Sequence, residues 1–107
     1  MIRSTTFKLM FTWEDEVDVA IKKDDGRIKS FSVNYRTKID ERWHDVIRYD
    51  TAHGKTHVHK FWMSPKMIPL KACTDMKSAI IEVTKDIKSN WATYKSRLTE
   101  KVKRNEK

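Results

Sequence analysis

The sequence predicts an α+β domain in which an antiparallel meander of about five strands is covered on one face by a long C-terminal helix. Polar and apolar residues alternate from Thr6 to Trp62 between short polar turns, and apolar residues recur every three or four positions from Met76 to Val102. Alternation indicates a strand with one buried face, whereas the longer spacing indicates an amphipathic helix. The turns are too short for parallel crossovers, so successive strands are predicted to pair antiparallel.

The first three strands are predicted at Thr6–Trp13, Val17–Lys22 and Ile28–Thr37. The first strand carries its large apolar side chains on one face, which we expect to be buried: Phe7, Leu9, Phe11 and Trp13. Asp24-Asp25-Gly26 predicts a tight hairpin turn between the second and third strands, because glycine readily adopts a positive φ.

The fourth and fifth strands are predicted at Trp43–Asp50 and Thr56–Trp62, after the charged connection Lys38–Arg42. The fourth strand has large side chains on both faces, which indicates a central position in the sheet. They are Trp43, Ile47 and Tyr49 on one face, and His44, Val46, Arg48 and Asp50 on the other. Ser64–Leu70 is predicted to be an irregular linker because it contains two prolines, which lack the amide donor that a ladder needs.

The helix is predicted from about residue 74 to residue 103, with Thr74 or Asp75 as its N-cap. Its apolar stripe comprises Met76, Ile80, Val83, Ile87, Trp91, Tyr94, Leu98 and Val102. Such a helix spans about 43 Å, whereas a seven-residue strand spans about 23 Å. We therefore expect the helix to overhang the sheet, with its stripe beyond Trp91 available for a homodimer or for a segment of a partner protein, and the basic tail 104–107 to fray.

Composition limits the class of protein. The chain has 107 residues, which corresponds to a single domain, 1–107, with its strands within residues 5–62. Its 23 Lys and Arg exceed its 15 Asp and Glu, so a polyanionic partner is expected, either nucleic acid or an acidic protein. Cys73 is the only cysteine, which excludes an internal disulfide. No signal peptide or long apolar run is present, so we expect a soluble, cytoplasmic protein without membrane contact.

The candidate site is Val46–His59, which reads VIRYDTAHGKTHVH and holds three of the four histidines. A hairpin brings strand ends together, so Asp50, His53 and His57 are expected within side-chain reach of one another. His57 and His59 are two positions apart on a strand, so both imidazoles leave the same face.

Three uses of this cluster remain open. The first is metal-free cleavage of RNA, in which histidines act as acid and base while Arg48 holds phosphate, without any cofactor. Its expected nucleic-acid contacts are Arg48, Lys55 and Lys60. The second is a metal site built from Asp50 and the histidines, although the chain has no Cys-x-x-Cys or His-Glu-x-x-His motif. The third is a structural or binding role without catalysis.

The run Arg48-Tyr49-Asp50-Thr51-Ala52-His53-Gly54, followed by His57-x-His59, resembles the RYD-x-AHG…H-x-H motif of the TumE-type toxin-like family. It is also similar to related small archaeal and bacterial families. The resemblance implies the toxin of a toxin–antitoxin pair, which acts on RNA or translation and has an antitoxin protein as its partner. The implied site residues are Arg48, Tyr49, Asp50, His53, Gly54, His57 and His59.

Overall fold

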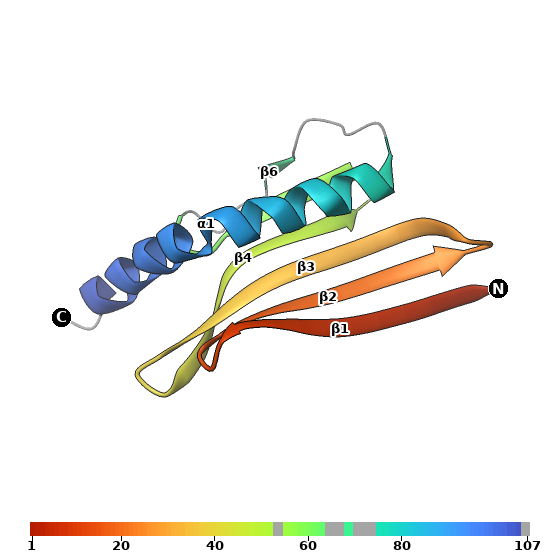
Figure 1. The fold of residues 1–107 in the computed structure, drawn as a ribbon. Coiled ribbons are helices and arrows are strands. Elements are labelled where there is room, and N and C mark those ends of the chain that lie inside the picture. Colours follow the sequence, from red (N-terminus) through yellow and green to blue (C-terminus); the bar gives the residue numbers. More distant parts are fainter. Residues whose placement is uncertain (53–54, 64–67, 70–74, 106–107) are drawn as a thin grey trace.

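The computed structural model describes residues 1–52, 55–63, 68–69 and 75–105. Within these residues, one antiparallel sheet has its strands in sequence order, and a long helix lies along one face of the sheet (Figure 1). The strands are β1 (Ile2–Thr12), β2 (Asp15–Asp24), β3 (Arg27–Ile39), β4 (Arg42–Ala52), β5 (Lys55–Lys60) and β6 (Ile68–Pro69), and the helix is α1 (Met76–Asn105). Because α1 packs on β3 and β4, the predicted α+β meander is confirmed.

The strands are longer than the sequence pattern predicted. β3 has 13 residues and so spans about 43 Å, while α1 has 30 residues and spans about 45 Å. The predicted difference in length between the helix and the strands is therefore wrong. The error arose at the strand ends, where the backbone pairs although the side chains no longer alternate, as at Ile2–Thr5 opposite β2.

β6 lies in the segment that was predicted to be an irregular linker. Ile68 and Pro69 pair antiparallel with Val58 and His57 of β5. A proline is compatible with this position because β6 is an edge strand, where one side of the backbone needs no amide donor. The prediction of a linker without strand pairing is wrong at these two residues.

Two hairpins have turns with positive φ. Asp25 and Gly26 form the β2–β3 turn with φ of 50° and 77°, which confirms the predicted hairpin. Asp40 and Glu41 join β3 to β4 with φ of 49° and 68°, without a glycine. A non-glycine residue in this region costs roughly 1–2 kcal/mol, so the sequence indicated a longer connection than the two residues observed.

The predicted alternation breaks within β4 and at the end of β1. Tyr35 pairs with Ile47 and Arg36 with Asp45, so Val46 is an extra residue in β4. Val46 is fully buried in the core rather than sharing a face with Arg48. Trp13, predicted to be buried, is 93% exposed, because β1 ends at Thr12 and Trp13 lies in the turn.

The core lies between α1 and the sheet, and the entire predicted stripe of α1 packs into it or against it. Its buried members are Val17, Val19, Phe31, Val33, Tyr35, Ile39, Val46, Ile47, Tyr49, Val58, Ala79, Val83, Ile87 and Leu98. Trp91 stacks on Phe11, with 5.5 Å between ring centroids, and Trp62 stacks on Tyr94 at 5.2 Å. The stripe beyond Trp91 thus packs against other parts of the same chain.

A buried carboxylate joins α1 to the sheet. Asp15 is 1% exposed and accepts hydrogen bonds from the hydroxyls of Tyr35 (2.6 Å) and Thr37 (2.7 Å). Lys95 Nζ of α1 lies 3.2 Å from Asp15 Oδ2. Burial raises the pKa of Asp15, but its hydrogen bonds with Thr12, Tyr35, Thr37 and Lys95 together lower it below its ordinary value. The carboxylate therefore stays charged and holds α1 in place.

The start of α1 is defined by a side-chain cap. Asp75 Oδ1 accepts a hydrogen bond from the Ser78 amide at 2.7 Å, which confirms Asp75 as the cap, while Thr74 and Cys73 lie outside the described residues. The helix continues through Asn105, into the stretch that was expected to fray. No helix in the described ranges is both long and apolar enough to cross a membrane.

Candidate functional site

The candidate site is on the face of the sheet that α1 leaves uncovered. Ile47, Tyr49 and Val58 point into the core, so the residues between them in β4 and β5 leave the opposite face. Arg48 pairs with His59, and Asp50 pairs with His57. Directly opposed side chains on antiparallel strands have Cβ atoms about 4.5–5.5 Å apart. These four residues, Arg48, Asp50, His57 and His59, are called the open-face cluster below.

Phe61 organises one half of the open-face cluster. The ring of His59 stacks on Phe61 with 3.9 Å between centroids and 22° between planes. The guanidinium carbon of Arg48 lies 5.7 Å from the centroid of the same ring. The predicted site did not include Phe61. The signal available in the sequence was its position two residues after His59.

The open-face cluster also contains buried polar atoms without hydrogen bonds. Among the described residues these include Arg48 Nε, Asp50 Oδ1 and His57 Nδ1. Arg48 Nε does lie near the other carboxylate oxygen, Asp50 Oδ2, at 3.7 Å. A buried polar atom without a partner costs about 1–3 kcal/mol. Asp50 and His57 thus offer an acceptor and an imidazole nitrogen from directly opposed positions.

Two other cations on this face, Lys8 and Arg36, are more fully neutralised than Arg48. Lys8 lies within 3.5 Å of Glu16 and 3.8 Å of Asp18. Arg36 lies 3.2 Å from Asp45 and 3.6 Å from Glu16. Arg48 has a single carboxylate neighbour in the described residues, at the longer distance given above. Its guanidinium is therefore more available for an anionic ligand than that of Arg36.

The cluster borders a shallow groove across β1–β4. Two adjoining hollows of about 370 and 510 Å³ share Thr6, Ala20 and Ser32 in their linings. Asp50 lines the first hollow and Arg48 lines the second. Because the shared residues are small and mostly hydroxylated, the groove can admit a polar ligand that extends away from the cluster.

Comparison with known proteins identifies the family. A family model described as a domain of unknown function, DUF7718, matches residues 2–104. The chain belongs to the DUF7718 family. No curated protein and no solved structure matches it. A function for this DUF7718 protein therefore has to be inferred from its own residues.

Tyr49 lies on the opposite face of β4 in this DUF7718 chain, apart from the cluster. Its hydroxyl donates a hydrogen bond to Asp86 Oδ2 of α1. Asp86 also accepts hydrogen bonds from Tyr94 (2.8 Å to Oδ2) and Asn90 (2.9 Å to Oδ1). Burial, and then the hydrogen bond and charge of Asp86, raise the pKa of Tyr94 to about 12 and also raise the pKa of Tyr49. Neither phenol loses its proton near neutral pH.

The remaining predicted residues are distributed as follows. His53 and Gly54 lie outside the described residues, as does the side chain of Lys55. Lys60 pairs with Ile47 on the helix-covered side of the sheet, so the structure does not bring it to Arg48. In the described part of this DUF7718 protein, no three His, Cys, Asp or Glu side chains are placed to hold a metal ion.

Proposed function

We propose that this protein cleaves RNA at the open-face cluster by metal-free acid–base chemistry. Such cleavage needs a base for the 2′-hydroxyl, an acid for the leaving 5′-oxygen and a cation for the developing charge on phosphorus. His57 and His59 leave one face of β5, with Cα atoms about 6.6 Å apart at about 3.3 Å per residue. This spacing leaves room for a phosphodiester between the two imidazoles.

The observation that carries the proposal is the pairing of Asp50 with His57. Asp50 Oδ1 and His57 Nδ1 are both buried without hydrogen bonds in the described residues. A hydrogen bond between them would fix the tautomer of His57 and leave Nε2 free to accept a proton, as a carboxylate does for a catalytic histidine elsewhere. This pairing favours His57 as the base.

In the proposed reaction, each of three side chains has one role. His57 takes the proton of the 2′-hydroxyl, and the 2′-oxygen forms a bond to phosphorus. The bond from phosphorus to the 5′-oxygen breaks, and His59 in its protonated form donates a proton to that oxygen. Arg48, directly opposite His59, binds the phosphate oxygens with its planar guanidinium. The products are a 2′,3′-cyclic phosphate and a 5′-hydroxyl.

The test is cleavage of end-labelled single-stranded RNA by the purified protein. We expect His57→Ala and His59→Ala to reduce the rate by about 10²–10⁴-fold, as is usual for loss of a general acid or base. His44→Ala is the matched control, because His44 pairs with Thr37 of β3 and not with a residue of the cluster. An RNA with a single 2′-deoxy position should resist cleavage at that position. Equal cleavage by all variants, or none by the wild type, would refute the proposal.

The resemblance to TumE-type toxin-like proteins supports a physiological role as a toxin that an antitoxin protein restrains. The same variants test this role in cells. Induced expression of the wild type and of His44→Ala should arrest growth, whereas His57→Ala should not. Growth arrest by all three proteins would show that toxicity does not depend on the open-face cluster.

A second candidate function is RNA binding without cleavage. The stack of Arg48 and His59 on Phe61 favours it, because planar cationic and aromatic groups also hold unpaired bases. Binding of RNA by the wild type that is lost in Arg48→Ala and Phe61→Ala, with no cleavage at any time, would identify this function instead.

A further inference from the structure

A second basic site lies on the helix-facing side of the sheet, at the end where β2 turns into β3. Arg3 of β1 is directly opposite Lys23 of β2. Like charges in directly opposed positions destabilise a sheet. Both residues are exposed, and in the part of the chain that the structure describes neither forms an ion pair. Their mutual repulsion is therefore uncompensated.

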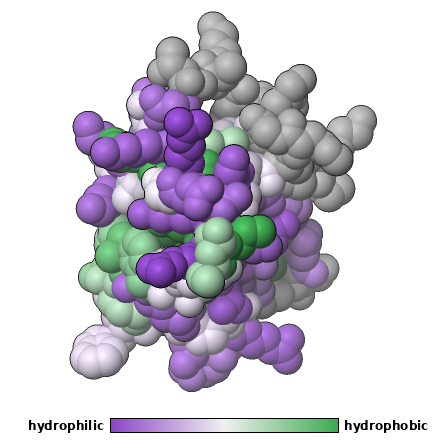
Figure 2. Space-filling model, turned by 90° about the vertical axis from the view of Figure 1, so that its right-hand side faces the viewer, coloured by the Kyte–Doolittle hydropathy of each residue, from purple (hydrophilic) through white to green (hydrophobic). Residues whose placement is uncertain are grey.

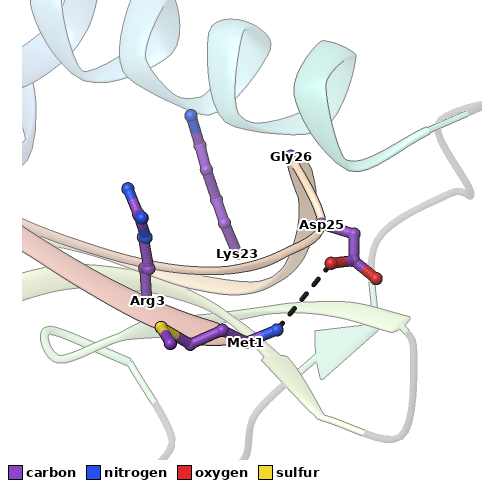
Figure 3. A pocket seen from close by; sticks show the side chains of 5 residues that line it. All are labelled: Met1, Arg3, Lys23, Asp25 and Gly26. Carbon is purple, nitrogen blue, oxygen red and sulfur yellow. Dashed lines mark ion pairs between the residues drawn. The ribbon is translucent and has the colours of Figure 1, made fainter.

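The carboxylates nearby are engaged elsewhere. Asp24 and Asp25 lie 3.2 and 3.7 Å from the N-terminal amine of Met1. Figure 3 shows Arg3 and Lys23 rising side by side from the strands toward α1, while Asp25 turns to the amine. Arg3 and Lys23 line a hollow of about 350 Å³ together with Met1, Asp25 and Gly26. The hollow thus presents two free cations to solvent.

The flank of α1 that faces this hollow is also basic. Lys95 lies on the flank of α1 that faces β2, because it forms an ion pair with Asp15 at the start of β2. Lys88 and Lys77 precede Lys95 by about two and five helical turns, so they lie on the same flank. Lys23 is about 26 Å along β2 from Asp15, and Lys77 is about 27 Å along α1 from Lys95. Since α1 runs along the strands (Figure 1), these lengths place Lys77 toward the same end of the molecule as Lys23.

An exposed aromatic ring lies further along the same face of β1. Phe7 pairs with the core residue Val19 and is still 45% exposed. It shares the face of Arg3 because the two are four positions apart on one strand. Figure 2 views this end of the molecule and shows hydrophilic side chains around a smaller hydrophobic area.

We propose that Arg3, Lys23 and Phe7 form a binding site for single-stranded nucleic acid, with Lys77 on the facing flank of α1. Phosphates placed between Arg3 and Lys23 would relieve their repulsion, and a base would stack on Phe7. An acidic peptide fits less well, because it would gain nothing from an aromatic ring. The site is independent of the open-face cluster, which lies on the other side of the sheet.

The test is fluorescence anisotropy with a labelled thymidine 20-mer of DNA. This probe has no 2′-hydroxyl, so its binding does not depend on the proposed cleavage. The test variant is Arg3→Gln with Lys23→Gln. The control variant, Lys103→Gln with Arg104→Gln, removes the same charge from the last turn of α1, at the opposite end of the helix from Lys77. Thermal melting verifies that both variants are folded.

We expect the slope of log Kobs against log salt concentration to fall by about 1.4 in the test variant, since each phosphate contact with a single strand contributes about 0.7. The control should keep the wild-type slope. Phe7→Leu should weaken binding about tenfold without changing the slope. An equal decrease of the slope in both double variants, or no decrease in the test variant, would overturn the proposal. Displacement of the oligonucleotide by polyglutamate at equal charge would overturn it in favour of an acidic protein.

Discussion

Adjacent residues of β4 serve different parts of the molecule because they leave opposite faces of the sheet. Arg48 and Asp50 belong to the open-face cluster, while Tyr49 between them bonds to Asp86 of α1. A motif in the sequence presents these three residues as one unit. In the strand, Arg48 and Asp50 contribute to the site, whereas Tyr49 contacts the helix. We therefore expect substitutions of Tyr49 to affect stability and not the site.

Replacing Tyr49 with Phe should lower the free energy of unfolding by about 1.5 kcal/mol, the usual contribution of a hydrogen bond to a charged group. The loss should stay near this value because Tyr94 and Asn90 still bond to Asp86. Urea unfolding measures it, with Tyr94→Phe as the matched variant. RNA cleavage should be unchanged. Normal stability together with lost cleavage would instead assign the Tyr49 hydroxyl to the reaction.

The helix is fixed against the sheet by polar contacts on two flanks as well as by its apolar stripe. On one flank, Asp86 accepts a hydrogen bond from Tyr49 of β4. On the other flank, Lys95 forms an ion pair with Asp15 of β2. Near the end of the helix, Lys101 Nζ donates to the carbonyl of Phe61 at 2.8 Å. Apolar packing alone would tolerate small rotations of α1 about its axis, whereas contacts on both flanks define a single orientation.

Asp15→Asn should lower the free energy of unfolding by about 2 kcal/mol near neutral pH, because it removes the charge that Lys95, Tyr35 and Thr37 stabilise. The folded state lowers the pKa of Asp15. The stabilisation is therefore complete above the unfolded pKa of about 3.9 and disappears as the pH falls through the lower folded pKa. Urea unfolding from about pH 7 to about pH 2 should show the wild type and variant converging at acid pH. A difference that stays constant with pH would contradict this account.

At the scale of the whole molecule, burial is uneven across the sheet. β3 lies beneath α1 and between two paired strands, and five of its side chains are buried. β1 forms an edge, has no described neighbour on its outer side, and exposes Ile2 and Met10 at 69% and 52%. Local stability should therefore decrease from the centre of the sheet toward β1.

Amide hydrogen exchange followed by mass spectrometry should show this gradient. Peptides from β3 should exchange most slowly, at a rate set by global unfolding, because their amides are paired on both sides under the helix. Peptides from β1 should exchange fastest among the long strands, since alternate amides point away from β2. Uniform protection across β1, β2 and β3 would show that the sheet opens only as a whole.

The long strands and the helix could be predicted because their periodicity depends only on residues that are neighbours in the sequence. The meeting of Asp50 with His57 also followed, since a short hairpin fixes which strand ends face each other. Other features depend on contacts between distant residues and left no local signal. The Asp40-Glu41 turn has no glycine, the extra residue Val46 looks like any alternating valine, and the partner of Tyr49 is 37 positions away.

The order of the strands along the chain has a kinetic consequence. Each strand pairs with the one synthesised just before it, so its contacts close short loops and the entropy cost of closure stays small. The sheet is therefore expected to assemble in steps as the chain leaves the ribosome. α1 is the last of the described elements to be made. Until it docks, the apolar face of the nascent sheet stays exposed to water, and this interval is when the chain is most prone to aggregate or to need a chaperone.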